Sequence, residues 1–361
     1  MISTFHRSRH LVSLWEKADF FQQKSRFNDA LKSYSKIIKL TPSSNEKANA
    51  HLAMAGIHRL QGRLAVSIYH YQQSMHWFKS IRSDQIWDAK TGLALALRFQ
   101  GDNFTAFNML TRSFQFYNKK KDQAGIAFSY WALGSTERFR GHMIQGHTKL
   151  LLALKKFRQL RNTEGLIYTY CALGGVSRMM GDLTNSYRFY HRAQFLAQKH
   201  SDFFAIAYSY CGLGNVWRMR NQFSIAFDFF NRAEKYYKKI HDRVSYAYTL
   251  WSMGTAYKMM SQYARAENFF RRAESLFSRT RDPRGLLYIY LSRAEIAWIL
   301  KKYSKSKFFV KSFHQILQQN SFPFEKNHMR NFKKITQTPN NLKPNSMPFF
   351  IATATLPINW P

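Results

Sequence analysis

The sequence is poor in acidic residues. Its 361 residues include 20 Asp plus Glu against 55 Lys plus Arg, which gives a formal net charge of +35. Charged residues make up only 21% of the chain, so the positive balance comes from missing acids and not from an excess of lysine. Hydrophobic residues reach 45%, enough for a real core, and this excludes a disordered basic protein. The charge alone points to nucleic acid or to an acidic partner.

Cysteine and long apolar runs are also scarce. Two cysteines in 361 residues exclude a disulfide scaffold and fit a reducing compartment. No apolar run approaches the 18 residues that a membrane-spanning helix needs. The apolar patch near the N-terminus is too short for a secretory signal. We therefore expect a cytoplasmic protein with no transmembrane segment.

Proline is nearly absent until the C-terminal region. Six of the eight prolines lie in the last 41 residues, together with clustered Asn, Thr and Lys. This composition predicts that residues 321–361 form a largely disordered basic tail, with a short basic helix around Phe324 to Ile335. Truncation at Asn320 without loss of stability would support the independence of this tail from the array.

The rest of the chain carries an internal repeat. Four similar segments place glycines at a spacing of 40 residues, and further small residues continue the series in both directions with slightly shorter steps toward the N-terminus. Such a period predicts an array of repeated supersecondary units. The small residues in register are Ala18, Ala55, Ala94, Gly134, Gly174, Gly214, Gly254 and Ala294.

Each unit contains the pattern of a helical hairpin. Twelve residues after the first small residue comes a second one, and four residues later a bulky one, as in Gly174, Ser186 and Tyr190. Two helices cross closely only where a side chain is small, and a large neighbour fills the space beside it. Turn formers such as Gly181 separate the two helices, and Asp or Asn precedes each first helix of the middle units as a cap. These features predict an all-α fold.

The repeat resembles the tetratricopeptide repeat (TPR). The first unit is the closest match, with Trp15, Ala18, Phe21, Ala30, Tyr34, Ile37 and Pro42. The middle units resemble the 40-residue form of Leu-Gly-Asn-repeat adaptors and kinesin light chains, with Leu213-Gly214-Asn215 intact once. The resemblance covers residues 11–320 and implies a right-handed superhelical solenoid of about eight hairpins. The repeats start near residues 11, 48, 87, 127, 167, 207, 247 and 287. The last unit departs from the pattern at Phe313.

The resemblance also implies which side chains face inward, because the first helix of each TPR hairpin lines the concave wall. With the first small residue as position eight, position twelve carries a cation in six consecutive units, and position two carries an aromatic ladder. Arginine grips carboxylates through two hydrogen bonds, which favours an acidic peptide in the groove. The alternative for the arginines is that they have no binding role, and that repeat duplication copied a surface arginine. For the tyrosines, packing between neighbouring helices is the favoured interpretation. The candidate partner-binding residues are Arg59, Arg98, Arg138, Arg178, Arg218, Lys258, Tyr168, Tyr208, Tyr248 and Tyr288.

No pattern indicates catalysis or a bound cofactor. The segment from Gly141 to Thr148 resembles a phosphate-binding loop, but its glycines fall at a turn and at a packing position, without a preceding strand. Cys171 and Cys211 occupy the same position in neighbouring units, where helix spacing of about 10 Å keeps them too far apart for a disulfide. We therefore expect no enzyme, no cofactor and no metal site.

Two functions are favoured from the sequence, while a peptide-sensing regulator resembling bacterial TPR signalling proteins, here without an effector domain, and anionic membrane association through the basic outer face also stay open. The first is a TPR adaptor or scaffold that binds an acidic peptide or protein segment in its basic, aromatic-lined concave groove. The second is non-specific binding of nucleic acid such as RNA through the basic surface, because a uniform arginine at one position suits phosphate but reads no sequence. The oligomeric state stays open.

Overall fold

The computed structural model describes residues 2–319 and 322–337. All regular elements in these ranges are α-helices, joined by short turns. Their order is α1 (Ile2–Gln23), α2 (Phe27–Leu40), α3 (Ser44–Leu60), α4 (Leu64–Ser80), α5 (Ile86–Phe99), α6 (Asn103–Lys119), α7 (Gln123–Arg140), α8 (Met143–Gln159), α9 (Thr163–Met179), α10 (Leu183–His200), α11 (Phe203–Met219), α12 (Phe223–Lys239), α13 (Arg243–Met259), α14 (Tyr263–Thr280), α15 (Pro283–Ile299), α16 (Tyr303–Gln319) and α17 (Pro323–Gln337).

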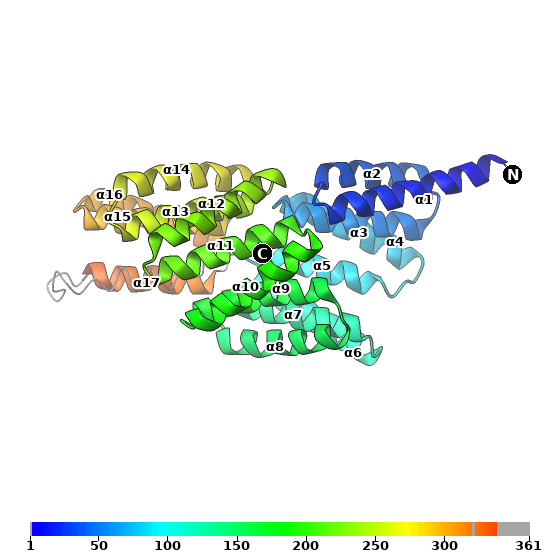
Figure 1. Ribbon diagram of the computed structural model, residues 1–361, viewed down its shortest axis with the longest axis horizontal. Coiled ribbons are helices and arrows are strands. Elements are labelled where there is room, and N and C mark those ends of the chain that lie inside the picture. The colour runs from blue at the N-terminus through cyan, green and yellow to red at the C-terminus, as the bar shows by residue number, and fades with distance from the viewer. Residues whose placement is uncertain (1, 320–321, 338–361) are drawn as a thin grey trace.

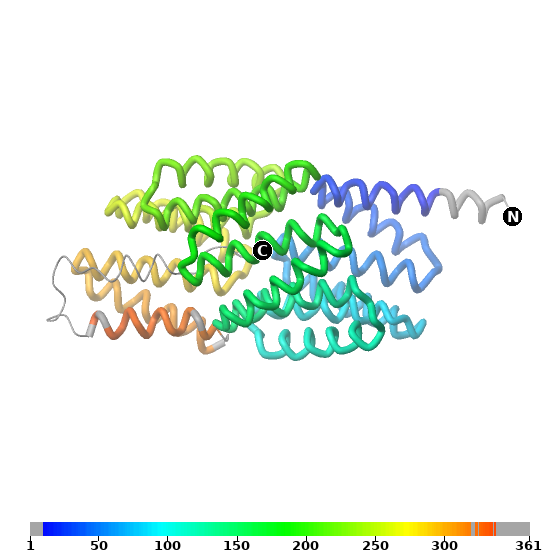
Figure 2. Tube along the Cα trace, turned by 60° about the horizontal axis from the view of Figure 1, so that its bottom comes forward, coloured from blue at the N-terminus to red at the C-terminus, as the bar shows by residue number. Residues whose placement is uncertain are grey.

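Helices α1 to α16 form eight antiparallel hairpins, units 1 to 8, each made of an odd-numbered and an even-numbered helix. The expected all-α superhelical solenoid is confirmed (Figure 1). Figure 2 shows the coil from a second direction, with α1 and α17 toward opposite ends of the long axis. In the part of the chain that the structure describes, no helix combines the length and apolar character needed to cross a membrane.

The predicted small-against-bulky pairs form the contact within each hairpin. A Cβ added at Gly174 would lie 2.8 Å from the ring of Tyr190, and one at Gly214 would lie 2.6 Å from the ring of Phe230. The predicted caps are also present. For example, Asp202 accepts a hydrogen bond from the Ala205 amide at 3.0 Å. The 40-residue period of the sequence is therefore the period of these close helix crossings.

Replacing one of these glycines tests the close crossing. Gly214→Ala is expected to lower the free energy of unfolding by about 2 kcal/mol, because the new methyl group overlaps the buried Phe230 ring. Gly56→Ala is the matched control, since Gly56 also lies within a helix and nothing lies within 4 Å of the added Cβ. The control should gain up to about 1 kcal/mol from helix propensity. Chemical denaturation followed by circular dichroism measures both, and equal midpoints would contradict the packing assignment.

The solenoid coils tightly, so units about five apart touch each other. The turn glycine of unit 2, Gly62, lies directly against Val244 of α13 in unit 7. The turn glycine of unit 3, Gly101, lies against Phe322, just before α17. We call this line of contacts between early and late units the seam. Because the seam closes the coil, the inward-facing side chains lie inside the molecule.

Helix α17 corrects the expected tail in part. It agrees with the short helix expected near residues 324–335, but it packs on α15 and also contacts α7. Pro323 follows Pro283, the first residue of α15, by 40 residues, so α17 takes the place of the first helix of a ninth unit. Phe322, Met329 and Phe332 are buried there. Residues 338–361, the remainder of the expected tail, lie outside the described residues.

Candidate functional site

The six position-twelve cations form a row along the inside of the coil, which we call the axial row. They come from the last turns of α3, α5, α7, α9, α11 and α13. Five of them are at most 2% exposed, and only Arg59 is half-buried. The groove expected from the sequence is therefore closed over most of the row, because the coil brings later units onto it. The buried members are Arg98, Arg138, Arg178, Arg218 and Lys258.

Most of the buried cations contact the next unit along the chain. Lys258 forms an ion pair with the buried Glu295 of α15. A Cβ added at Gly175 of α9 would lie 2.3 Å from Nη1 of Arg138, so this guanidinium needs the glycine beside it. Arg218 donates from Nη1 to Sδ of Met259 in α13 at 3.1 Å, and burial lowers the pKa of Arg218 to about 9. These contacts give the row a packing role between neighbouring units.

Arg98 has few groups around it that balance its charge. It is fully buried, and its one hydrogen bond runs from Nη1 to Oγ1 of Thr136 at 3.5 Å. The guanidinium lies over the ring of Phe139, 4.6 Å from its centroid, while Nε and Nη2 have no hydrogen-bond partner among the described residues. Burial lowers the pKa of Arg98 well below its ordinary value, and repulsion from the surrounding arginines adds to this effect; these are Arg138, Arg59 and Arg284.

The position-two tyrosines lie between consecutive first helices. Tyr168 donates to Oδ2 of Asp202, and Tyr248 donates to Oδ2 of Asp282, each at 3.0 Å. Both aspartates cap the first helix of the following unit. Tyr208 and Tyr288 are fully buried as well. Tyr168 and Tyr248 therefore each link their unit to the cap of the next one, and Tyr168 is also half-exposed toward a cavity.

An open cavity of about 350 Å³ lies where unit 1 and unit 2 face units 4 to 6; we call it the inner pocket. Two of the predicted site residues, Arg59 and Tyr168, line it. Its wall is aromatic on one side and includes one carboxylate. The residues that sequence reasoning did not single out are Gln22, Trp131, Phe157, Glu164 and Phe204. A second cavity of about 460 Å³ adjoins it and shares Tyr168, Glu164 and Phe204.

The two cysteines are buried packing residues. Cys171 and Cys211 are not joined in a disulfide, and burial raises the pKa of Cys171 to about 12. Such a thiol stays protonated at neutral pH and is a poor nucleophile. Within residues 2–319 and 322–337 there is no group of three or more His, Cys, Asp or Glu side chains placed to hold a metal ion.

No protein-family model matches the sequence, and no curated protein matches it. Solved structures do match. A Rap protein complexed with competence and sporulation factor has a TM-score of 0.69 at 13% identity, over 86% of this chain and 85% of that one. The Rap conjugation gene regulator of plasmid pLS20, in complex with the Phr* peptide, has a TM-score of 0.59 at 10% identity, over 90% and 97%.

The description of a third similar structure includes the tetratricopeptide repeat. This structure is the signal-transduction ATPase PH0952 from Pyrococcus horikoshii, described with a tetratricopeptide repeat sensor. It matches with a TM-score of 0.52 at 16% identity, over 86% of this chain and 47% of that one. The fold is that of a TPR array. At these identities the likeness establishes the fold, and the function has to be argued from the residues of this TPR array.

Proposed function

We propose that this TPR array is a non-enzymatic cytoplasmic adaptor or scaffold that binds an acidic peptide or protein segment along its inner face. The observation that carries the proposal is the unbalanced positive charge of the axial row at Arg98. A buried guanidinium without a counter-charge destabilises the folded protein. A ligand that places a carboxylate beside it offsets a large part of this unfavourable free energy, and this favours binding. One of the similar solved structures contains a bound peptide by its description, and another contains a bound competence and sporulation factor, which supports a peptide or protein segment as the ligand.

Helix α17 provides an internal example of carboxylate recognition. Glu325 is 1% exposed; Nε of Arg284 lies 2.7 Å from its Oε1, and the Tyr288 hydroxyl donates to the same oxygen at 2.9 Å. The Arg284 guanidinium lies between the rings of Phe139 and Phe322, 4.2 and 4.9 Å from their centroids. An arginine, a position-two tyrosine and aromatic rings thus hold one carboxylate on this face. Similar groups recur along the axial row.

The inner pocket supplies the entry to this face. Arg59 reaches it from unit 2, and Phe128, which is 38% exposed, offers apolar contact at its wall. A ligand that continues from Arg59 to Arg98 has to widen the seam. In a solenoid, small changes between successive units add up to a large change in pitch, so the seam can open without unfolding any hairpin.

Selection from a random-peptide display library on the full-length protein tests the proposal. The selected peptides are expected to be enriched in Asp and Glu, with an aromatic residue nearby. The variant Arg59→Gln/Arg98→Gln should lose this enrichment while its circular dichroism spectrum stays helical. Arg192→Gln/Arg232→Gln removes the same charge from exposed positions on α10 and α12 and should keep it. Selection of peptides without an acidic preference, or equal enrichment on both variants, would refute acidic recognition on the inner face.

A further inference from the structure

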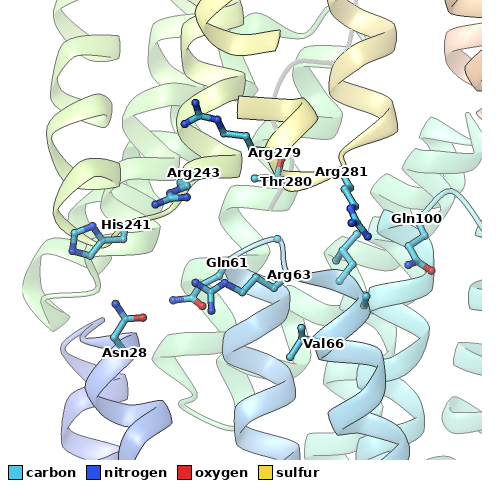
Figure 3. Close-up of a pocket in the computed structure, with 13 residues that line it drawn as sticks. Asn28, Gln61, Arg63, Val66, Gln100, His241, Arg243, Arg279, Thr280 and Arg281 are labelled. Carbon is cyan, nitrogen blue, oxygen red and sulfur yellow. The ribbon is translucent and has the colours of Figure 1, made fainter. Parts of the chain in front are cut away.

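A third cavity lies on the seam, and no residue of the axial row lines it. It has a volume of about 510 Å³, and three turns that are far apart in the sequence enclose it. Gln61, Gly62 and Arg63 belong to the turn between α3 and α4. The opposite side is formed by the turns before α13 and α15, and Figure 3 shows His241, Arg243, Arg279 and Arg281 there. We call this cavity the seam pocket.

The seam pocket is lined by cations and by no carboxylate. Four arginines and His241 contribute to its wall, and no Asp or Glu does. All four guanidinium groups are exposed, and in the described ranges none of them forms an ion pair; they are Arg63, Arg243, Arg279 and Arg281. Three separate turns therefore bring like charges to one cavity, where they repel each other until an anion lies between them.

One further feature of the pocket suits an anion. Helix α4 starts at the pocket without a side-chain cap, since its N-cap residue is Arg63. Leu64, Ala65 and Val66 line the cavity, so the unpaired backbone amides of this first turn lie at its wall.

We propose that the seam pocket binds a small polyanion with two or more phosphate groups. Arginine forks bind phosphate oxygens in pairs, and several of them on one cavity match several phosphates on one molecule. The volume exceeds what a single phosphate fills. Four arginines line one concave cavity, which favours a compact ligand over a nucleic-acid backbone. No residue of the axial row lines this pocket, so the proposal stands independently of acidic-peptide binding.

A polyanion in the seam pocket has a structural consequence. It bridges the turn of unit 2 to the turns that precede units 7 and 8, and it neutralises the repulsion between them. The bound form then keeps the seam closed. A ligand that binds only the closed coil stabilises it by mass action and opposes any ligand that needs the seam open.

Inorganic tripolyphosphate is the probe, titrated against the full-length protein at physiological salt and followed by calorimetry and thermal shift. Wild type is expected to bind it, with a rise in Tm. Arg243→Gln/Arg281→Gln should weaken the affinity about tenfold or more, because it removes two phosphate-binding forks. Arg192→Gln/Arg232→Gln carries the same charge change on the outer helices and should bind like wild type.

Three results would overturn the proposal. Equal loss of affinity in both double variants would show general charge screening and no site. Absence of tripolyphosphate binding to wild type would exclude a small polyanion. Binding of single-stranded RNA that depends on Arg243 and Arg281, without binding of tripolyphosphate, would assign the seam pocket to nucleic acid instead.

Discussion

Truncation after Asn320 is expected to lower the free energy of unfolding by about 5 kcal/mol. It removes α17 and with it three buried apolar side chains, Phe322, Met329 and Phe332, each of which contributes about 1.5–3 kcal/mol on burial. It also leaves the buried Arg284 without Glu325, its ion-pair partner. The packing of α17 therefore argues against independence of the segment after Asn320 from the array.

Urea denaturation followed by circular dichroism measures the loss. Truncation after Gln337 is the matched control, because it keeps all of α17 and should leave the midpoint unchanged. Glu325→Gln keeps the packing and removes only the charge, so it should cost a few kcal/mol through the uncompensated Arg284. An unchanged midpoint after truncation at Asn320 would show that α17 does not cap the array.

Acidification is expected to destabilise the array through three buried histidines in unit 2. His51 and His58 of α3 and His70 of α4 are each at most 9% exposed. Nδ1 of His51 lies 2.8 Å from Nδ1 of His70, and the His58 ring stacks on His70 with centroids 5.4 Å apart. Burial, followed by repulsion from His70, lowers the pKa of His51 and of His58 to about 4, with Arg63 adding to the effect on His58.

The sign follows from the two states of the chain. Histidines have a pKa near 6.5 in the unfolded state. The free energy of unfolding is therefore at its full value above pH 6.5 and decreases as pH falls from 6.5 toward 4, because the unfolded state binds protons first. The loss is on the order of several kcal/mol for the cluster. Burial raises the pKa of Asp242 to about 6. Protonation of this carboxyl group therefore increases the free energy of unfolding as the pH falls through a similar range, opposite to the effect of the histidines. A comparison of variants therefore isolates the histidines.

The measurement is Tm against pH from 7 to 4. His51→Gln/His58→Gln is expected to flatten the decrease seen in wild type. His76→Gln, at an exposed position on helix α4, which also carries His70, should leave the dependence of Tm on pH unchanged. If the double variant and wild type lose stability in parallel, the histidine cluster does not govern the acid transition.

The fold was largely predictable from the sequence, because its signals are local. A glycine followed by a small residue twelve positions later and by tyrosine or phenylalanine sixteen positions later specifies a hairpin, and an aspartate cap specifies where the next helix begins. Helix α17 was also accessible in principle, since Pro323 continues the 40-residue spacing from Pro283. The proline-rich composition around it concealed this signal.

The state of the candidate site was not predictable in the same way. Whether Arg98 lines an open groove or lies buried depends on the pitch of the coil, and the pitch accumulates from small rotations at each unit interface. The contact of Gly62 with Val244 joins units five apart, and no motif within one unit encodes it. The inner pocket and the seam pocket both depend on such contacts, so their residues could not be grouped from the repeat alone.

The most direct test of acidic recognition is a comparison of two peptides on two proteins. A selected acidic peptide and its Glu→Gln counterpart are titrated against wild type and against Arg59→Gln/Arg98→Gln by calorimetry. Wild type is expected to prefer the acidic peptide by about tenfold or more. The variant should bind the two peptides about equally, because the carboxylate contributes to affinity only when the arginines are present to bind it. An equal preference in both proteins would contradict the account.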